Sequence, residues 1–192
     1  MIRTRVDLHQ YLEQDLKNYS SQTKGLIHTF RYNKLASPIS DQKYIWKYVK
    51  VLRYTEYWIN KDKSILQKLI KLYYLGKLRK LSRITDFQIP PNTIGAGLTI
   101  WHWGPIIVNP AVKIGKNCTL NPMVIIGHKK PGEAAPQIGD NVFIGGGAKL
   151  IGAIRIGNNV TIAPNSVVVK DIEDDCIVAG VPCRIIGYKK RR

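Results

Sequence analysis

Aliphatic side chains recur at every sixth position through the second half of the chain. The series is Val108, Ile114, Leu120, Ile126, Gly132, Ile138, Ile144, Leu150, Ile156, Ile162 and Val168, and only Gly132 interrupts it. A period of six fits neither an amphipathic helix, with its period of about 3.6, nor a half-buried strand, with its period of about 2. It is typical of a solenoid, in which short strands stack the same side chain on each successive coil.

Two further positions of the repeat support the solenoid. Glycine follows the aliphatic residue at Gly115, Gly127, Gly139, Gly145 and Gly157, where the chain has to turn tightly. The fifth position, which we expect to point inward at a corner, holds Cys118, Val124, Val142, Ala148, Ile154, Val160 and Ser166. A β-sandwich would need hairpin turns about every 8–12 residues, and none fit here. We therefore predict a mainly β fold, a parallel β-helix of hexapeptide repeats.

The preceding part of the chain has helical patterning. Three apolar stripes are visible: Leu8, Tyr11, Leu12 and Leu16; Ile45, Val49 and Leu52; and Leu66, Leu69, Ile70 and Tyr73 after an Asp62/Ser64 start signal. Residues 19–42 are weakly patterned and expected to be rich in loops. Because consecutive prolines, Pro90 and Pro91, end a helix, we predict a helical region at 1–90, the β-helix at 91–188 and a basic tail at 189–192.

Two irregularities interrupt the repeat. Coil-like segments at Ile94, Ile100 and Ile106 stand two residues out of register with the main series, which predicts a slip or bulge near residues 106–108. The stretch from His128 to Gln137 is polar and contains proline and glycine, and in-register repeats flank it. It predicts a loop extruded from the side of a coil, and loops on rigid scaffolds are where sites are commonly built.

The chain is strongly basic, with a net charge of +17 over 192 residues. This favours anionic partners such as phosphates, acidic glycans or lipid, whereas no nucleic-acid-binding motif is recognised and we expect no such partner. The basic, aromatic segment 44–53 either packs against the coils or contacts anionic lipid, where lipid-linked glycans are assembled. No membrane span or signal-peptide core is evident, which predicts a cytoplasmic protein. Three cysteines without metal-ligand spacing predict neither a metal site nor a disulfide framework.

The repeat, the extruded loop and the closing segment from Ala179 to Gly187 together resemble the hexapeptide-repeat acyltransferases. The segment from Ile89 to Gly104 is similar to the serine acetyltransferase branch, and more closely to the serine-acetyltransferase-like enzymes of bacterial capsule and exopolysaccharide pathways. The resemblance implies a left-handed coil, a homotrimer and acetyl-CoA as co-substrate, with no metal.

His102 is the catalytic residue that the resemblance implies, with Gly104 close behind it. An acceptor hydroxyl attacks a thioester poorly until a base removes its proton, and an imidazole with a pKa near ~6.5 suits that task. The alternative is a histidine packed between Trp101 and Trp103.

Departures from the serine acetyltransferase pattern bear on the acceptor. The branch has an orienting aspartate fifteen residues before its histidine, where this chain has Phe87, and Asp86 is one residue off. An Arg-His pair that holds the amino acid is replaced by Ala134-Ala135. A free amino acid needs charged partners, whereas the indoles of Trp101 and Trp103 suit the apolar face of a sugar. His128, which opens the loop, is a further candidate for substrate contact.

For coenzyme A, the resemblance implies a groove between adjacent subunits. Gly146 would let the pantetheine arm approach the backbone, and Pro164 matches a position that lines the groove. Lys170 and Arg184 match basic residues near the nucleotide phosphates. The alternative for both is a solvated basic edge.

These observations predict an acetyl-CoA-dependent O-acetyltransferase that acts on a sugar hydroxyl of a surface polysaccharide, with His102 as general base and direct transfer. One alternative keeps the chemistry and takes L-serine as acceptor. Another is non-catalytic, a β-helical scaffold or anion-binding module.

Overall fold

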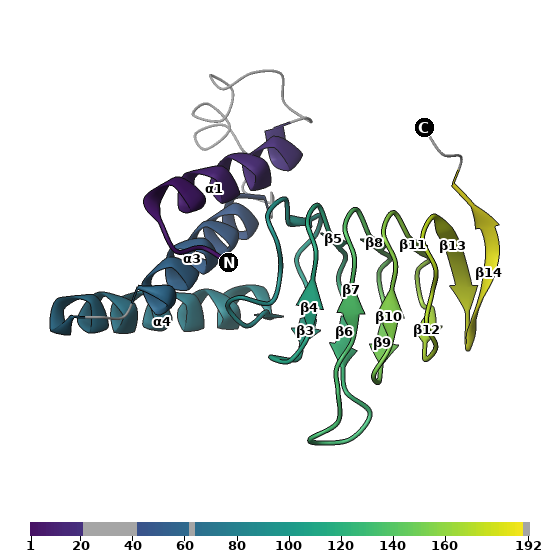
Figure 1. Ribbon diagram of the computed structural model, residues 1–192. Helices are drawn as coiled ribbons and strands as arrows, with labels where there is room; N and C mark the ends of the chain where they lie inside the picture. The colour runs from purple at the N-terminus through teal and green to yellow at the C-terminus, as the bar shows by residue number, and fades with distance from the viewer. Residues whose placement is uncertain (21–41, 62–63, 190–192) are drawn as a thin grey trace.

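The computed structural model describes residues 1–20, 42–61 and 64–189. Helices form the first part of the chain and short strands the second (Figure 1). The helices are α1 (Arg5–Ser20), α3 (Gln42–Asn60) and α4 (Ile65–Thr85). The strands are β1 (Phe87–Gln88), β2 (Thr99–Ile100), β3 (Ile106–Val108), β4 (Lys113–Ile114), β5 (Thr119–Leu120), β6 (Val124–Gly127), β7 (Gln137–Ile138), β8 (Phe143–Ile144), β9 (Lys149–Ile151), β10 (Arg155–Ile156), β11 (Thr161–Ile162), β12 (Val167–Val168), β13 (Cys176–Gly180) and β14 (Cys183–Tyr188).

The strands form three parallel sheets that run along the coil axis, with the orders β1-β3-β6-β9-β12, β4-β7-β10 and β2-β5-β8-β11-β13. From β1 to β13, successive strands along the chain belong to different sheets, so the chain winds as a parallel β-helix (Figure 1). At the last coil β14 adds to β13 in antiparallel fashion. The helices stand at one end of the coils and this hairpin at the other (Figure 1). The predicted β-helix is confirmed.

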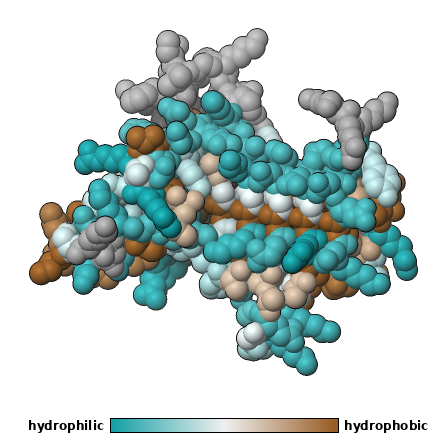
Figure 2. All heavy atoms as spheres, in the orientation of Figure 1, coloured by the Kyte–Doolittle hydropathy of each residue, from teal (hydrophilic) through white to brown (hydrophobic). Residues whose placement is uncertain are grey.

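The six-residue periodicity corresponds to a buried aliphatic side chain that recurs in every strand from β2 to β12. Ile100, Leu120, Ile144 and Ile162 stack in one column and are fully buried. On the face that Figure 2 shows, an apolar band runs along the coils between polar rows. Cys118, predicted to point inward, is buried too, and burial raises the pKa of its thiol to about 12.

Strand pairing locates the two irregularities of the repeat. Ile100 pairs with Leu120, twenty residues later, whereas Ile106 pairs with Val124, only eighteen later. The two extra residues therefore lie within 101–105, before the segment 106–108 where the sequence predicted the slip. Ile106 was predicted to be out of register, but it is in register with the later coils because the extra residues precede it. The second irregularity is the predicted loop, which follows β6 and projects from the coils (Figure 1).

The helices cap the first coil. On α3 the predicted stripe of Ile45, Val49 and Leu52 is buried against the coils. Of the two alternatives predicted for this segment, this is the one in which it packs against the coils. On α4 the helix begins as predicted, with the Ser64 hydroxyl accepting a hydrogen bond from the Gln67 amide. However, the stripe used to predict α4 does not face the core, since Leu66 and Leu69 are 68% and 59% exposed.

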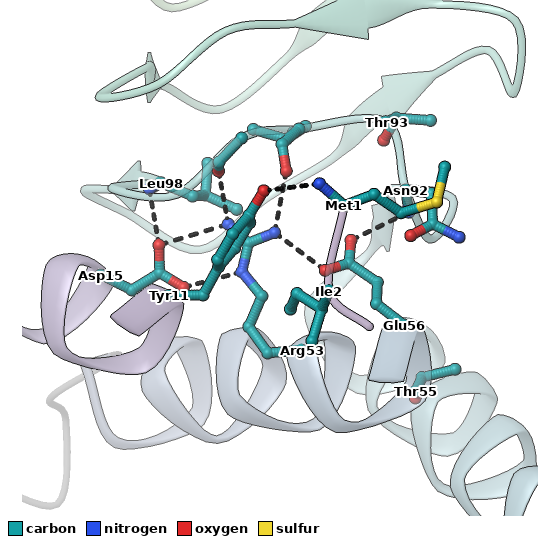
Figure 3. Close-up of polar contacts among 12 residues, drawn as sticks. Met1, Ile2, Tyr11, Asp15, Arg53, Thr55, Glu56, Asn92, Thr93 and Leu98 are labelled. Carbon is teal, nitrogen blue, oxygen red and sulfur yellow. Dashed lines mark hydrogen bonds and ion pairs between the residues drawn. The ribbon is translucent and has the colours of Figure 1, made fainter. Parts of the chain in front are cut away.

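A buried ionic cluster joins α1 and α3 to the first coil (Figure 3). Arg53 donates to Asp15 at 2.7 Å, to Glu56 at 3.0 Å and to the carbonyls of Ile94 and Gly95 at 2.9 and 2.7 Å. Burial alone would lower the pKa of Arg53, but the Glu56 and Asp15 carboxylates outweigh that effect and raise it. Because both carboxylates also accept backbone N–H groups of the first coil, every charge here has several partners, as a buried ion requires.

The predicted domain boundary at 90/91 stays a prediction. The first strand, β1, lies before that boundary and already pairs with β3. In the predicted tail, the Lys189 amide donates a hydrogen bond to the Asp175 carbonyl, and residues 190–192 lie outside the described part. The predicted loop-rich segment 19–42 falls largely on residues 21–41, which also lie outside it. In the described ranges no helix is long and apolar enough to cross a membrane.

Candidate active site

His102 lies in the turn that contains the two extra residues, between β2 and β3. The turn carries Trp101, His102 and Trp103, and the His102 side chain is exposed. Gly104 adopts a φ of +136°, and a side chain there would approach Pro122 at 3.1 Å. Glycine thus lets the extended turn fold back on the next coil. The His102 side chain is accordingly exposed to solvent and not packed between the two indoles.

The N-terminus of α3 contacts this turn. The Gln42 side-chain amide donates to the Trp101 carbonyl at 2.9 Å, and the Tyr44 ring lies 5.4 Å from the Trp103 ring. Both Tyr44 and Trp103 are more than a third exposed. No role in the site was predicted for Gln42 or Tyr44. Their signal in the sequence is the cluster of aromatic residues near the start of the helix.

The His102 turn begins a column of turns along one edge of the β-helix, here called the His102 edge. It comprises the connections 101–105, 121–123, 145–148, 163–166 and 181–182. Backbone hydrogen bonds stack these connections: Gly147 donates to the Pro122 carbonyl at 2.9 Å and Asn165 to the Gly146 carbonyl at 2.8 Å. Since coils are spaced by about 4.8 Å, Gly146 stands about 10 Å and Pro164 about 14 Å along the edge from the His102 turn.

Of the three glycines 145–147, Gly146 is the one at which the described chain would leave room for a side chain. A Cβ at Gly145 would meet the Pro164 amide nitrogen at 2.5 Å, and Gly147 has a φ of +75°. By contrast, a Cβ at Gly146 would find its nearest atom, the Pro122 carbonyl oxygen, at an ordinary 3.4 Å. Packing within the described chain therefore does not require glycine here, and the bare backbone suits the close approach of a ligand.

The remaining predicted residues divide between two edges. Arg184 is exposed and pairs with Ala179 of β13 beside the 181–182 turn, so it lies at the far end of the His102 edge. His128 follows β6 and Lys170 follows β12, at the opposite end of the same sheet's strands. We call this opposite side the His128 edge. One chain thus brings together His102, Gly146, Pro164 and Arg184, and separates them from His128 and Lys170.

The structure also shows where Phe87 and Asp86 lie, at and next to the position where the serine acetyltransferase pattern has its aspartate. Phe87 is fully buried and packs edge-on against Tyr48 at 5.1 Å, so it belongs to the core. Asp86 is exposed, and its carbonyl accepts the Ile106 amide, which puts it beside the start of β3 on the His102 edge. Within the described residues, no protein group hydrogen-bonds the His102 ring, and no cluster of side chains suited to a metal ion is present.

Sequence comparisons identify similar proteins. The family model described as bacterial transferase hexapeptide (six repeats) matches residues 135–170. The chain is 37% identical over 113 residues to a serine acetyltransferase of Synechococcus elongatus, covering 57% of this chain and 46% of that protein. It is 37% identical over 129 residues to the serine acetyltransferase of Staphylococcus xylosus, covering 64% of this chain and 59% of that protein. The chain therefore spans about half the length of the curated relatives it matches.

Solved structures extend the likeness over nearly the whole chain. The serine acetyltransferase from Brucella abortus superposes with a TM-score of 0.73 at 24% identity, covering 96% of this chain and 71% of that one. The Neisseria gonorrhoeae serine acetyltransferase in complex with serine gives a TM-score of 0.70 at 25% identity, covering 95% and 70%. The helices and the coils thus occur together in these proteins, and the fold is theirs. By its repeats and its relatives the chain is similar to the hexapeptide-repeat acyltransferases and, among them, to serine acetyltransferases, whose fold it shares.

Proposed function

We propose that this protein is an acetyl-CoA-dependent O-acetyltransferase in which His102 is the general base. The observation that carries the proposal is the His102 edge, where an exposed histidine and a glycine that packing does not require stand on one line of stacked turns. Coenzyme A complexes are known for the similar serine acetyltransferase of Brucella abortus, which supports acetyl-CoA as the co-substrate.

In the proposed reaction His102 removes the proton of the acceptor hydroxyl. The hydroxyl oxygen attacks the thioester carbonyl, and the C–S bond then breaks to release the coenzyme A thiolate, which takes up the proton held by the imidazolium. An exposed imidazole suits both steps because the same ring nitrogen can accept a proton and then donate it. Gly146 and Pro164 would line the path of the pantetheine arm, and Arg184 would meet nucleotide phosphates at the far end of the edge.

We further propose a cyclic homotrimer. Its support is the division of the candidate residues between the two edges of one sheet, which a single chain does not bring together. In a ring with head-to-tail contacts, the His102 edge of one copy faces the His128 edge of the next. His128 and Lys170 would then complete the site, with the lysine adding charge for the coenzyme phosphates.

L-Serine is the acceptor that the comparisons favour. The curated relatives are serine acetyltransferases, and the similar protein of Neisseria gonorrhoeae is known in complex with serine. The acceptor predicted first, a capsule or exopolysaccharide sugar, finds no support among these proteins. Serine, the alternative acceptor of the sequence analysis, is therefore the better candidate.

A sugar hydroxyl remains the second candidate because of one specific feature. Trp103 and Tyr44 form an exposed aromatic surface next to His102, with ring centroids 5.4 Å apart. Aromatic faces stack on the apolar C–H face of a sugar, whereas the charged ends of serine need charged partners.

Release of coenzyme A thiol, measured with the purified full-length chain, tests both proposals. We expect acetyl-CoA turnover that depends on an added hydroxyl acceptor, with L-serine compared against free hexoses and N-acetylhexosamines. Turnover with serine alone would remove the sugar candidate, and turnover with sugars alone would remove serine. Absence of turnover with every acceptor, together with no measurable binding of coenzyme A, would favour the non-catalytic alternative.

A further inference from the structure

Helix α4 has two apolar faces, and the described part of the chain covers one of them. On the inner face the Tyr74 ring stacks on Tyr54 at 5.4 Å, and Leu78 and Leu81 are buried. The residues of the other face are Ile65, Leu66, Leu69, Leu72 and Tyr73, which are 79%, 68%, 59%, 60% and 61% exposed. Their spacing by three and four residues aligns them along one side of the helix. A contiguous exposed apolar stripe of this kind marks an interaction surface.

The charges on α4 accompany this stripe. The helix carries Lys68, Lys71, Lys77, Arg79, Lys80 and Arg83 and no acidic residue. Lys77 lies over the Tyr73 ring at 5.5 Å, at the margin of the stripe. Arg79, Lys80 and Arg83 are exposed on the following turns. We call the five apolar residues, together with Lys68, Lys77, Arg79, Lys80 and Arg83, the α4 outer face.

The geometry points to an anionic lipid surface as the partner of the α4 outer face. An amphipathic helix rich in Lys and Arg places its apolar side in the headgroup and acyl boundary and its cations among anionic headgroups. A second copy fits less well, because pairing two such faces would bring two sets of five positive charges together. The N-terminal half of α4 extends away from the coils, with hydrophobic atoms at its tip, so a flat surface reaches it freely (Figures 1 and 2).

This assignment differs from the lipid contact considered from the sequence. That alternative placed the contact on segment 44–53, whose Ile45, Tyr48 and Leu52 are buried in α3. The assignment to α4 does not depend on acetyl transfer, so either proposal can fail without the other.

Flotation of the full-length chain with vesicles tests the assignment. We expect binding to vesicles of phosphatidylglycerol and phosphatidylcholine, no binding to phosphatidylcholine alone, and weaker binding as salt is raised. The triple variant Lys68→Gln/Arg79→Gln/Arg83→Gln should lower the partition coefficient by about 100-fold, since each cation near an anionic surface contributes about fivefold. Its matched control, Lys43→Gln/Lys47→Gln/Lys50→Gln, removes the same charge from exposed positions of α3 and should have a much smaller effect.

The apolar contribution is tested by Leu66→Ser/Leu69→Ser, with Val6→Ser on α1 as the control at a similarly exposed position. We expect the double variant to lose vesicle binding while keeping its circular dichroism spectrum and its sedimentation coefficient. Three results would overturn the assignment: no binding of the wild-type chain to anionic vesicles, equal binding by the α4 and control variants, or a change of oligomer mass in Leu66→Ser/Leu69→Ser. The last would identify the face as a contact between copies.

Discussion

At the scale of single residues, adjacent glycines of the 145–147 turn have different roles. Gly145 is required by packing, since its Cβ would stand 2.5 Å from the Pro164 nitrogen, whereas a methyl group at Gly146 meets nothing closer than 3.4 Å. We therefore expect Gly146→Ala to keep the melting temperature and to weaken coenzyme A binding at least tenfold. Gly145→Ala, the matched control, should lower the melting temperature. Calorimetric titration and thermal unfolding measure both, and unchanged coenzyme A affinity in folded Gly146→Ala would remove Gly146 from the site.

Substitution of the aromatic pair beside His102 distinguishes between the two candidate acceptors, a sugar and serine. If a sugar stacks on Trp103, then Trp103→Ala should raise the acceptor KM several-fold and leave the acetyl-CoA KM unchanged. Arg184→Ala should do the reverse, by a modest factor that grows at low salt, because exposed charge contacts contribute only roughly 0–1 kcal/mol and are screened. Steady-state kinetics against both substrates measure these effects. If the two variants alter only the acetyl-CoA KM, the sugar candidate is lost.

At the scale of elements, Arg53 links α1 and α3 to the first coil through Asp15 and the carbonyls of Ile94 and Gly95. Replacement by Met would leave the Asp15 and Glu56 carboxylates buried without their cation. Breaking a buried pair in this way costs about 3–5 kcal/mol, so Arg53→Met should lower the free energy of unfolding in urea by roughly that amount. Lys50→Met, at an exposed position of the same helix, is the control and should change it little. Equal effects of the two variants would show that the cluster does not stabilise the cap.

The strands were predictable from the sequence because each repeat buries one side chain at a fixed spacing. Ile100 and Leu120, for example, both occupy that position although the chain between them contains two extra residues. The helices were predictable as elements, but the packed face of α4 was not, since its apolar residues surround the helix and periodicity alone does not choose between Leu69 and Leu78. The Asp15–Arg53–Glu56 cluster was missed too. Its signal was the presence of charged residues inside two apolar stripes.

The candidate site was only partly predictable, for a related reason. The resemblance named His102 and Gly146, and the stacking of short coils then aligned them on one edge. Gln42 and Tyr44 reach the same turn from a helix about sixty residues earlier, and no local pattern encodes that contact. His128 and Lys170 were predicted for the same site, yet the structure puts them on the opposite edge of the chain.

At the scale of the whole molecule, the separation of the two edges predicts a ring. We expect sedimentation equilibrium at micromolar concentration to give three times the mass of the 21.8 kDa chain. A stable monomer would contradict the proposed assembly, because no groove between copies would then exist for coenzyme A.

The same geometry predicts complementation between inactive chains. If a site uses His102 of one copy and His128 of the next, His102→Ala and His128→Ala chains should each be impaired as homotrimers. Co-expressed in equal amounts, they should recover about a quarter of wild-type activity, since about one interface in four then has both histidines. The acetyl-transfer rate of the purified mixture measures this. If the activity of the mixture is only the average of the activities of the two separate variants, then no site combines His102 of one copy with His128 of the next.

The most direct test of the account is acetyl transfer by His102→Ala. Loss of a general base lowers the rate by about 10²–10⁴-fold, and the substitution of an exposed residue should leave the oligomer and the melting temperature unchanged. His9→Ala, which removes an exposed histidine from α1, is the control and should keep full activity. The account predicts that coenzyme A thiol release falls at least a hundredfold in His102→Ala alone. Activity within a few-fold of the wild-type chain, in a folded protein of the same mass, would contradict the role of His102 as base.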